Sequence, residues 1–228
     1  MTPKQFRSII KQEQKKARDS VIDFVEGAIK GDLERMHRSM VRLEYGAGYG
    51  YGWRCAFRRI AREEPVSDRA RSLFLKVFLD MGDHIRQETD DDLTYLKGLR
   101  ALLPSYDGPP VPLYRGERAT NRRYRTYGPS WSADRDVARS FAITASAQSR
   151  GGGVLFAAVV EPAAIIAAPA ILDDRYGEQE YIVDRRFLSM VLVEERFPEL
   201  THEEFARLTT ETDTEASPHR DAGRNNGC

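Results

Sequence analysis

The spacing of apolar residues changes character once along this chain, and that change limits the fold more than any other feature. Up to about residue 103, apolar side chains recur every three or four positions, as on one face of an amphipathic helix. Beyond the proline–glycine cluster at residues 104–110 they come in short runs rich in β-branched and aromatic side chains, which is typical of strands. The sequence therefore predicts an α+β protein in which the helices come first.

About four helices are predicted in the first part, and their apolar stripes are interpreted as core rather than as cofactor contacts. Capping residues mark their starts and ends: Gly31, Asp32, Ser67, Asp68 and the acids of residues 89–92. The glycine-rich stretch 45–52 between them is interpreted as a loop. Phosphate binding there lacks support, because no Gly-Lys-Ser/Thr sequence follows and no strand precedes.

Strands are predicted at residues 111–115, 153–160, 181–183 and 187–193, with one helix from Asp134 to about Ala142. From about Thr209 the chain contains almost nothing to bury, so this tail is predicted to be disordered. The expected organisation is a helical region at 1–105, a core at 106–208 and a tail at 209–228.

Composition excludes several classes of function. The 35 lysines and arginines balance the 35 aspartates and glutamates, so no overall charge favours nucleic acid or membrane, although residues 122–125 form a local basic cluster. Two cysteines make no disulfide framework, and four scattered histidines lack metal-ligand spacing, so no metal is expected. No apolar run is long enough for a signal peptide or a membrane span. We therefore expect a cytoplasmic protein, or one delivered into a target or host cell.

Three short motifs carry chemistry. They are Arg115 at the end of a predicted strand, a Ser-x-Ser segment at Ser130 and Ser132, and a Glu-x-Glu pair at Glu178 and Glu180. Each alone has an ordinary explanation: a solvated arginine, helix-capping serines, or the exposed face of an edge strand. Their order and spacing make the set more specific than any member.

Together the three motifs resemble the arginine–serine–glutamate class of mono-ADP-ribosyltransferases, which includes arginine-modifying bacterial toxins and phage-borne enzymes. The resemblance covers residues 111–193 and leaves out the helical region and the tail. It implies a mixed, two-sheet β core with an NAD cleft, preceded here by an N-terminal helical bundle. It also implies NAD as co-substrate, without a metal.

The resemblance assigns a role to each motif. A guanidinium binds phosphate oxygens with two donors, so Arg115 is assigned to the phosphate and ribose side of NAD. Glu180 would stabilise the oxocarbenium-like cation that forms when the nicotinamide–ribose bond breaks. Ser130 would orient that carboxylate, with Ser132 as its backup. The predicted NAD-binding set is Arg115, Gly116, Ser130, Trp131, Ser132, Phe141 and Glu180. For Phe141, a place in the helix core is the alternative.

Glu178 indicates which kind of group accepts the ADP-ribose. In an extended chain, residues i and i+2 project to the same face, so Glu178 and Glu180 are expected to share one cleft. In the family, Glu-x-Glu accompanies arginine acceptors, so the partner implied is a protein with an acceptor arginine. Arg175 and Tyr176, in the preceding loop, are assigned to recognition of that protein, and an immunity or antitoxin protein is a further expected partner class.

Two alternatives stay open at this point. The same fold could hydrolyse NAD, as a glycohydrolase, or modify a nucleic acid or a small molecule. The chain could also be a binding or phage structural module whose motifs are degenerate, with the helices as its working part. Sequence separates the first alternative from protein modification only weakly.

Overall fold

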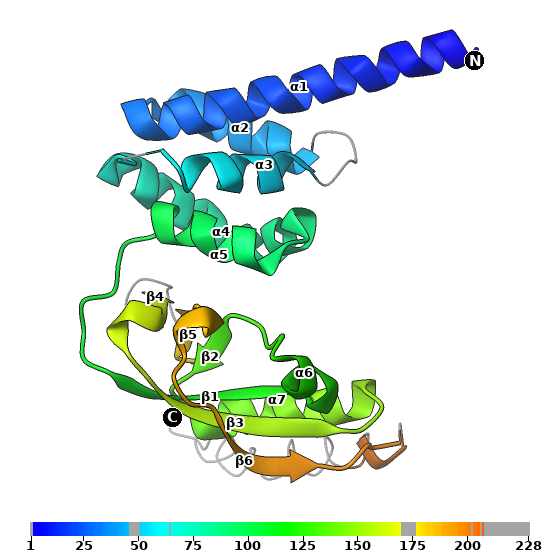
Figure 1. Cartoon of the computed structure of the whole chain (residues 1–228), viewed down its shortest axis with the longest axis vertical. Helices are drawn as coiled ribbons and strands as arrows, with labels where there is room; N and C mark the ends of the chain where they lie inside the picture. The colour runs from blue at the N-terminus through cyan, green and yellow to red at the C-terminus, as the bar shows by residue number, and fades with distance from the viewer. Residues whose placement is uncertain are drawn as a thin grey trace, which may run out of the picture. The chain divides into compact units, whose positions relative to one another are not determined.

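The protein is described here by a computed structural model, drawn in Figure 1, and forms two compact units. The described residues are 2–45, 51–63, 65–169, 177–201, 203–205 and 207. The first unit comprises Met1–Val111, Gly128–Trp131 and Val160–Leu188, and the second comprises Pro112–Tyr127, Ser132–Val159 and Ser189–Cys228. These units differ from the expected division near residue 105, because apolar side chains of the later strands, such as Ile166 and Ile182, pack in the same core as the helices.

Five helices open the first unit, seen from blue to green in Figure 1. They are α1 (Pro3–Lys30), α2 (Leu33–Tyr45), α3 (Tyr51–Ile60), α4 (Asp68–Thr89) and α5 (Asp92–Leu102). The predicted caps are confirmed. Gly31 ends α1 with φ 68°, Ser67 accepts the Ala70 N–H at the start of α4, and Asp91 accepts the Thr94 N–H at the start of α5.

Helix α3 was missed by the sequence analysis, which assigned its first two residues to a glycine-rich loop. Its inward face carries Trp53, Ala56, Phe57 and Ile60, all at most 1% exposed. This i, i+3, i+4, i+7 spacing is the helical signal that the neighbouring glycines obscured. The remainder of the expected loop, residues 46–50, lies outside the described residues.

Aromatic rings fill the core of the first unit. Phe57 lies between Trp53, with ring centroids 5.6 Å apart, and Phe74, at 6.2 Å in an edge-on arrangement. A Cβ on Gly98 of α5 would lie 2.3 Å from the Phe57 ring, so α3 and α5 approach closely only because this residue is glycine. The helical spacing of apolar residues therefore predicts which positions lie in the core. Close approaches between helices, such as that at Gly98, are seen only in the structure.

Six strands in the described part of the chain form one sheet in the order β4-β5-β2-β1-β3-β6. Their bounds are β1 Val111–Arg118, β2 Ser130–Ser132, β3 Gly153–Val160, β4 Ile165–Ala167, β5 Glu180–Val183 and β6 Leu192–Phe197. The α+β class is confirmed, while the second sheet that was expected is not found among the described residues. Antiparallel pairing joins Ile165 to Val183 and Tyr114 to Ser132.

The strand expected at residues 187–193 is wrong in its position. A 3-10 turn, η2 (Arg185–Phe187), follows β5, because the Asp184 carboxylate accepts the Arg186 N–H and caps the turn. The strand β6 starts only at Leu192, and it pairs antiparallel with β3.

In the second unit, helix α7 (Arg135–Gln148) packs closely on the strands. A Cβ on Gly116 of β1 would lie 2.2 Å from the Ala138 carbonyl oxygen, and one on Gly153 of β3 would lie 2.1 Å from the Ala142 carbonyl oxygen. Alanine and glycine thus set the helix–strand distance here. The unit also contains a short helix, α6 (Ala119–Tyr124), that the sequence analysis did not predict.

No helix in the described ranges combines the length and apolar character needed to cross a membrane. The tail that was predicted to be disordered, residues 209–228, lies outside the described residues.

Candidate functional site

Ser130 and Glu180 meet in the first unit, on neighbouring strands. The Val183 N–H donates to the Pro129 carbonyl oxygen at 2.7 Å, which fixes the chain beside Ser130 against β5. The Ser130 hydroxyl then donates to Glu180 Oε1 at 2.5 Å, across 50 positions of sequence. Ser130 is exposed and Glu180 is half-buried, so solutes can reach this carboxylate.

Glu178 and Glu180 do not follow the extended geometry that was expected. Gln179 between them has φ 44°, in the left-handed region that non-glycine residues rarely adopt, and β5 begins only at Glu180. The alternation rule for extended chains therefore does not apply across Gln179. Backbone in this region is over-represented at functional sites, where the surrounding structure holds it.

Arg115 lies in the second unit, on β1, where it pairs with Glu117 two positions along the same strand. Its Nε and a terminal nitrogen donate to Glu117 Oε2 at 3.0 and 2.7 Å. Glu117 is 7% exposed and also accepts from the Arg118 N–H and the Asn121 side chain. A guanidinium orientated by a buried carboxylate is preorganised.

The other predicted NAD contacts have mixed environments. Ser132 is buried and accepts the Asp134 N–H at 2.9 Å, so it shapes the start of α7. Trp131 is 1% exposed, and Gly116 faces the backbone of α7. Phe141 is 51% exposed, so its alternative placement in the helix core is wrong. The predicted recognition residues Arg175 and Tyr176 lie outside the described residues.

Asp184, directly after β5, is a charged site that the sequence analysis missed. Its carboxylate is completely buried and bonds Arg186 at 2.6 Å and Arg100 of α5 at 3.3 Å. Burial opposes its ionisation, but hydrogen bonds from Arg186 and Arg100 and the charge of Arg186 outweigh burial and hold the pKa of Asp184 below its ordinary value. Arg100 also donates to the Ala163 carbonyl oxygen at 2.7 Å. The group ties α5 to the strands of its unit.

Asp92 forms a second clamp of the same kind. It accepts from Arg86 of α4 at 3.1 Å and from Arg185 of η2 at 2.8 Å. Burial opposes its ionisation, yet the two arginines lower the pKa of Asp92. The signal in the sequence was the run Asp184-Arg185-Arg186 at a strand end. Asp184 bonds Arg100 and Arg185 bonds Asp92, and these two partners, both on α5, lie 84 and 93 positions earlier in the chain.

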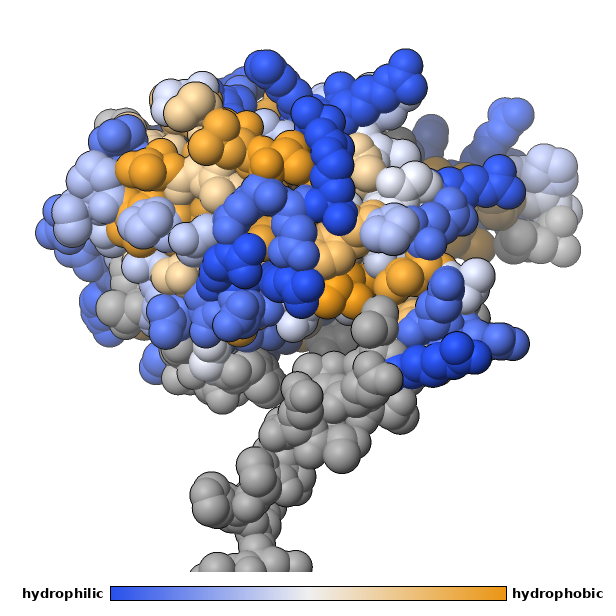
Figure 2. All heavy atoms as spheres, turned by 90° about the horizontal axis from the view of Figure 1, so that it is seen from below, coloured by the Kyte–Doolittle hydropathy of each residue, from blue (hydrophilic) through white to orange (hydrophobic). Residues whose placement is uncertain are grey.

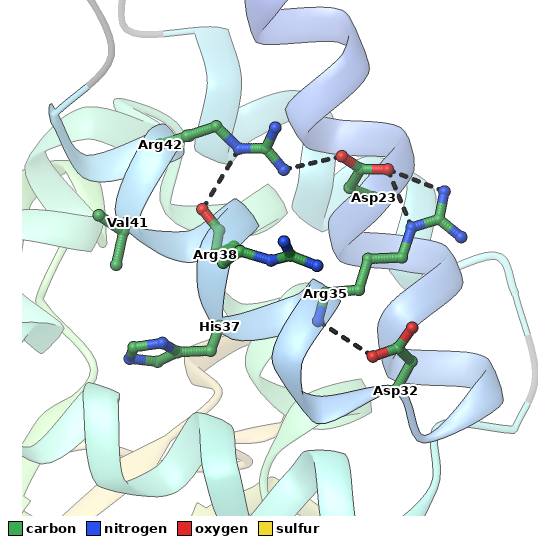
Figure 3. Close-up of a pocket in the computed structure, with 7 residues that line it drawn as sticks. All are labelled: Asp23, Asp32, Arg35, His37, Arg38, Val41 and Arg42. Atoms are coloured by element: carbon green, nitrogen blue, oxygen red, sulfur yellow. Dashed lines mark hydrogen bonds and ion pairs between the residues drawn. The ribbon is translucent and has the colours of Figure 1, made fainter.

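A surface depression of about 620 Å³ lies on α1 and α2. Figure 3 shows Arg35 and Arg42 directed at Asp23, which they contact at 2.8 and 2.7 Å. Although partial burial opposes ionisation of Asp23, these two arginines lower its pKa. Acids of α1 already neutralise these two cations. We therefore interpret the depression as part of the contact between the two helices and not as a ligand site.

Apolar side chains are exposed in several places, including Val159, Met190 and Leu192 of the second unit, each more than half exposed. On the face seen in Figure 2, apolar residues alternate with strongly hydrophilic ones instead of forming a continuous apolar surface. Scattered exposure of this kind is ordinary for a folded chain and assigns no partner.

Within the described part of the chain, no three His, Cys, Asp or Glu residues are grouped so that they could hold a metal ion. Comparison of the chain with protein-family models, with curated proteins and with solved structures gave no match.

Proposed function

We propose that the chain is an NAD-dependent mono-ADP-ribosyltransferase that modifies an arginine of a target protein. The observation that carries the proposal is the hydrogen bond from Ser130 to the reachable carboxylate of Glu180. The motif order predicts this contact between two residues that lie 50 positions apart in the sequence. The finer architecture, with two sheets and an NAD cleft behind a helical bundle, belongs to the same proposal.

The chemistry follows from an accessible, orientated carboxylate. When the C1′–N bond of NAD breaks, its electron pair leaves with nicotinamide and positive charge develops on the ribose. Glu180 stabilises that charge and accepts a hydrogen bond from the 2′-hydroxyl, so its interaction is stronger in the transition state than in the ground state. Ser130 holds the carboxylate in position, and Arg115 binds the pyrophosphate of NAD.

The acceptor step completes the balance of atoms. A guanidine nitrogen of the target arginine forms the new bond to C1′ and loses one proton. Glu178 takes that proton and attracts the incoming cation. Because Gln179 turns the backbone between the two glutamates, this role for Glu178 depends on the family resemblance and not on strand alternation.

The test is incubation of the purified chain with adenylate-labelled NAD and a cell lysate. We expect labelled protein, stable to mercuric ion and released by hydroxylamine, as arginine linkages are. Glu180→Gln should remove the label, while Glu161→Gln, an exposed acid after β3, should leave it unchanged. Equal labelling by wild type and Glu180→Gln would overturn the proposal.

NAD hydrolysis is the second candidate, favoured by the exposure of Ser130, which leaves water access to the reacting carbon. In that case free ADP-ribose accumulates without labelled protein, and the same Glu180→Gln variant abolishes it. Separating free from protein-bound label therefore distinguishes the two activities in one experiment.

A further inference from the structure

Four arginines gather around α6 in the second unit. Arg118 precedes the helix, Arg122 and Arg123 form its last turn, and Arg125 follows it with φ 52°. All four are exposed, as is Tyr124 among them, at 69%. We call these five residues the α6 patch, and Figure 1 shows the short helix after β1 that carries it.

The patch arginines differ from the two arginines of α7, which have acid partners. Arg135 pairs with Glu194 and Arg139 with Glu195, and both pairs join α7 to β6. Among the described residues, no acid forms an ion pair with any of the four patch arginines. Glu117, which is adjacent in sequence, is buried and is held by Arg115 and Asn121. The patch is therefore an uncompensated positive surface.

The arrangement opposes the stability of the helix itself. Arg118 and Arg122 lie at i and i+4, where like charges on a helix repel each other. A helix of six residues has little intrinsic stability with which to tolerate that repulsion. Residues that destabilise their own helix are expected where the surface they form binds a ligand.

We propose that the α6 patch binds the phosphate backbone of single-stranded RNA. Arginine binds phosphate through two parallel N–H donors, and the eight residues from Arg118 to Arg125 extend over about 10 Å, enough for about three phosphates. Tyr124 offers an exposed ring on which an unpaired base stacks. That ring favours a nucleic acid over an acidic peptide, and RNA is the nucleic acid commonly met with unstacked bases. The balanced net charge of the chain conceals this local asymmetry.

The test measures binding of the full chain to a fluorescein-labelled, 12-nucleotide single-stranded RNA of mixed sequence by fluorescence anisotropy. We expect the logarithm of the affinity to fall with the logarithm of salt concentration with a slope of about −2, for three phosphates at about 0.7 each. Arg122→Glu with Arg123→Glu should weaken binding at least about tenfold and reduce the slope by about 1.4. Arg62→Glu with Arg69→Glu, two exposed arginines of the first unit, changes the net charge equally and should leave binding intact.

Substitutions of Tyr124 test whether a base stacks on its ring. Tyr124→Ala should weaken binding about tenfold, the loss expected for one stacked base, whereas Tyr124→Phe should bind as wild type does. Unfolding temperatures of all variants check that α6 is retained, and Arg122→Gln with Arg123→Gln replaces the charge reversal if that variant unfolds. The proposal is overturned if wild type fails to bind at low salt, if the first-unit control loses as much affinity, or if a 12-residue glutamate peptide or duplex DNA binds as tightly as the RNA.

Discussion

The two ends of β5 carry acids in opposite environments. At its start, Glu180 is half-buried and is held by the hydroxyl of Ser130. Just past its end, Asp184 is fully buried between Arg100 and Arg186. The acid bound by two cations connects elements of the fold, whereas the acid proposed to act on NAD accepts a hydrogen bond from a neutral hydroxyl and can be reached from solution. Three residues of β5 thus separate the fully buried carboxylate from the one proposed to act on NAD.

The largest effect is expected at the buried end. Asp184→Asn should lower the free energy of unfolding by about 3 kcal/mol, because it removes the charge that two arginines surround. Chemical denaturation of the full chain measures this loss. Asp107→Asn, an exposed acid in the segment before β1, serves as the control and should change the free energy of unfolding by less than about 0.5 kcal/mol.

The pH dependence of the same variant sharpens this contrast. The folded pKa of Asp184 lies below its ordinary value of 3.8, so its contribution to stability is fully present above the unfolded pKa. That contribution is lost as pH falls through the folded value. The difference in stability between wild type and Asp184→Asn should therefore be constant near neutral pH and shrink as the solution is acidified below about pH 4. A difference independent of pH would contradict the ionised clamp.

Next to the open end, Glu178→Gln is expected to separate transfer to the acceptor from cleavage of NAD. This variant should slow transfer to arginine about a hundredfold, the lower range for loss of a general base, while NAD cleavage continues. The measurement is the ratio of protein-bound to free ADP-ribose. If transfer and cleavage fell together, Glu178 would act on NAD rather than on the acceptor.

Much of the fold could be predicted from the sequence, because capping residues and helical spacing act locally. Ser67 and Asp91 cap the helices where expected, and α7 begins directly after Asp134, where its start was predicted. The helix α3 was not predicted, because the glycines at its start obscured its regular apolar face. The break at Gln179 was lost because no local rule places a glutamine in the left-handed region.

The candidate site could be predicted only in part, for a similar reason. Motif order paired Ser130 with Glu180, and the structure brings them together. The clamp of Asp184 depends on Arg100, 84 positions earlier, and the Arg115–Glu117 pair depends on a buried carboxylate whose burial only the folded strand determines. Contacts between distant positions and the burial of a side chain are both set by packing, which a single sequence does not display.

A smaller effect is expected from Ser130→Ala. Loss of the orientating hydroxyl should slow NAD cleavage about tenfold, at the lower end for partners of a functional residue. Ser140→Ala, an exposed serine on α7 whose hydroxyl donates to the Asp136 carbonyl oxygen, is the matched control and should leave the rate unchanged.

The smallest expected effect is the change in protein stability when Glu180, at the open end of β5, is replaced. Glu180→Gln should change the free energy of unfolding by less than about 0.5 kcal/mol, since the hydrogen bond to Ser130 can be kept and the side chain is only half-buried. Thermal and chemical denaturation both report it. A loss as large as that of Asp184→Asn would make the two ends of β5 alike and remove the distinction.

The most direct test is the rate of nicotinamide release from NAD in a double-mutant cycle of Ser130→Ala and Glu180→Gln. The account predicts a loss of at least about a hundredfold for Glu180→Gln, about tenfold for Ser130→Ala, and no further loss when both are changed, because the serine acts only through the carboxylate. An unchanged rate in Glu180→Gln, or effects that multiply in the double variant, would contradict a catalytic pair at this end of β5.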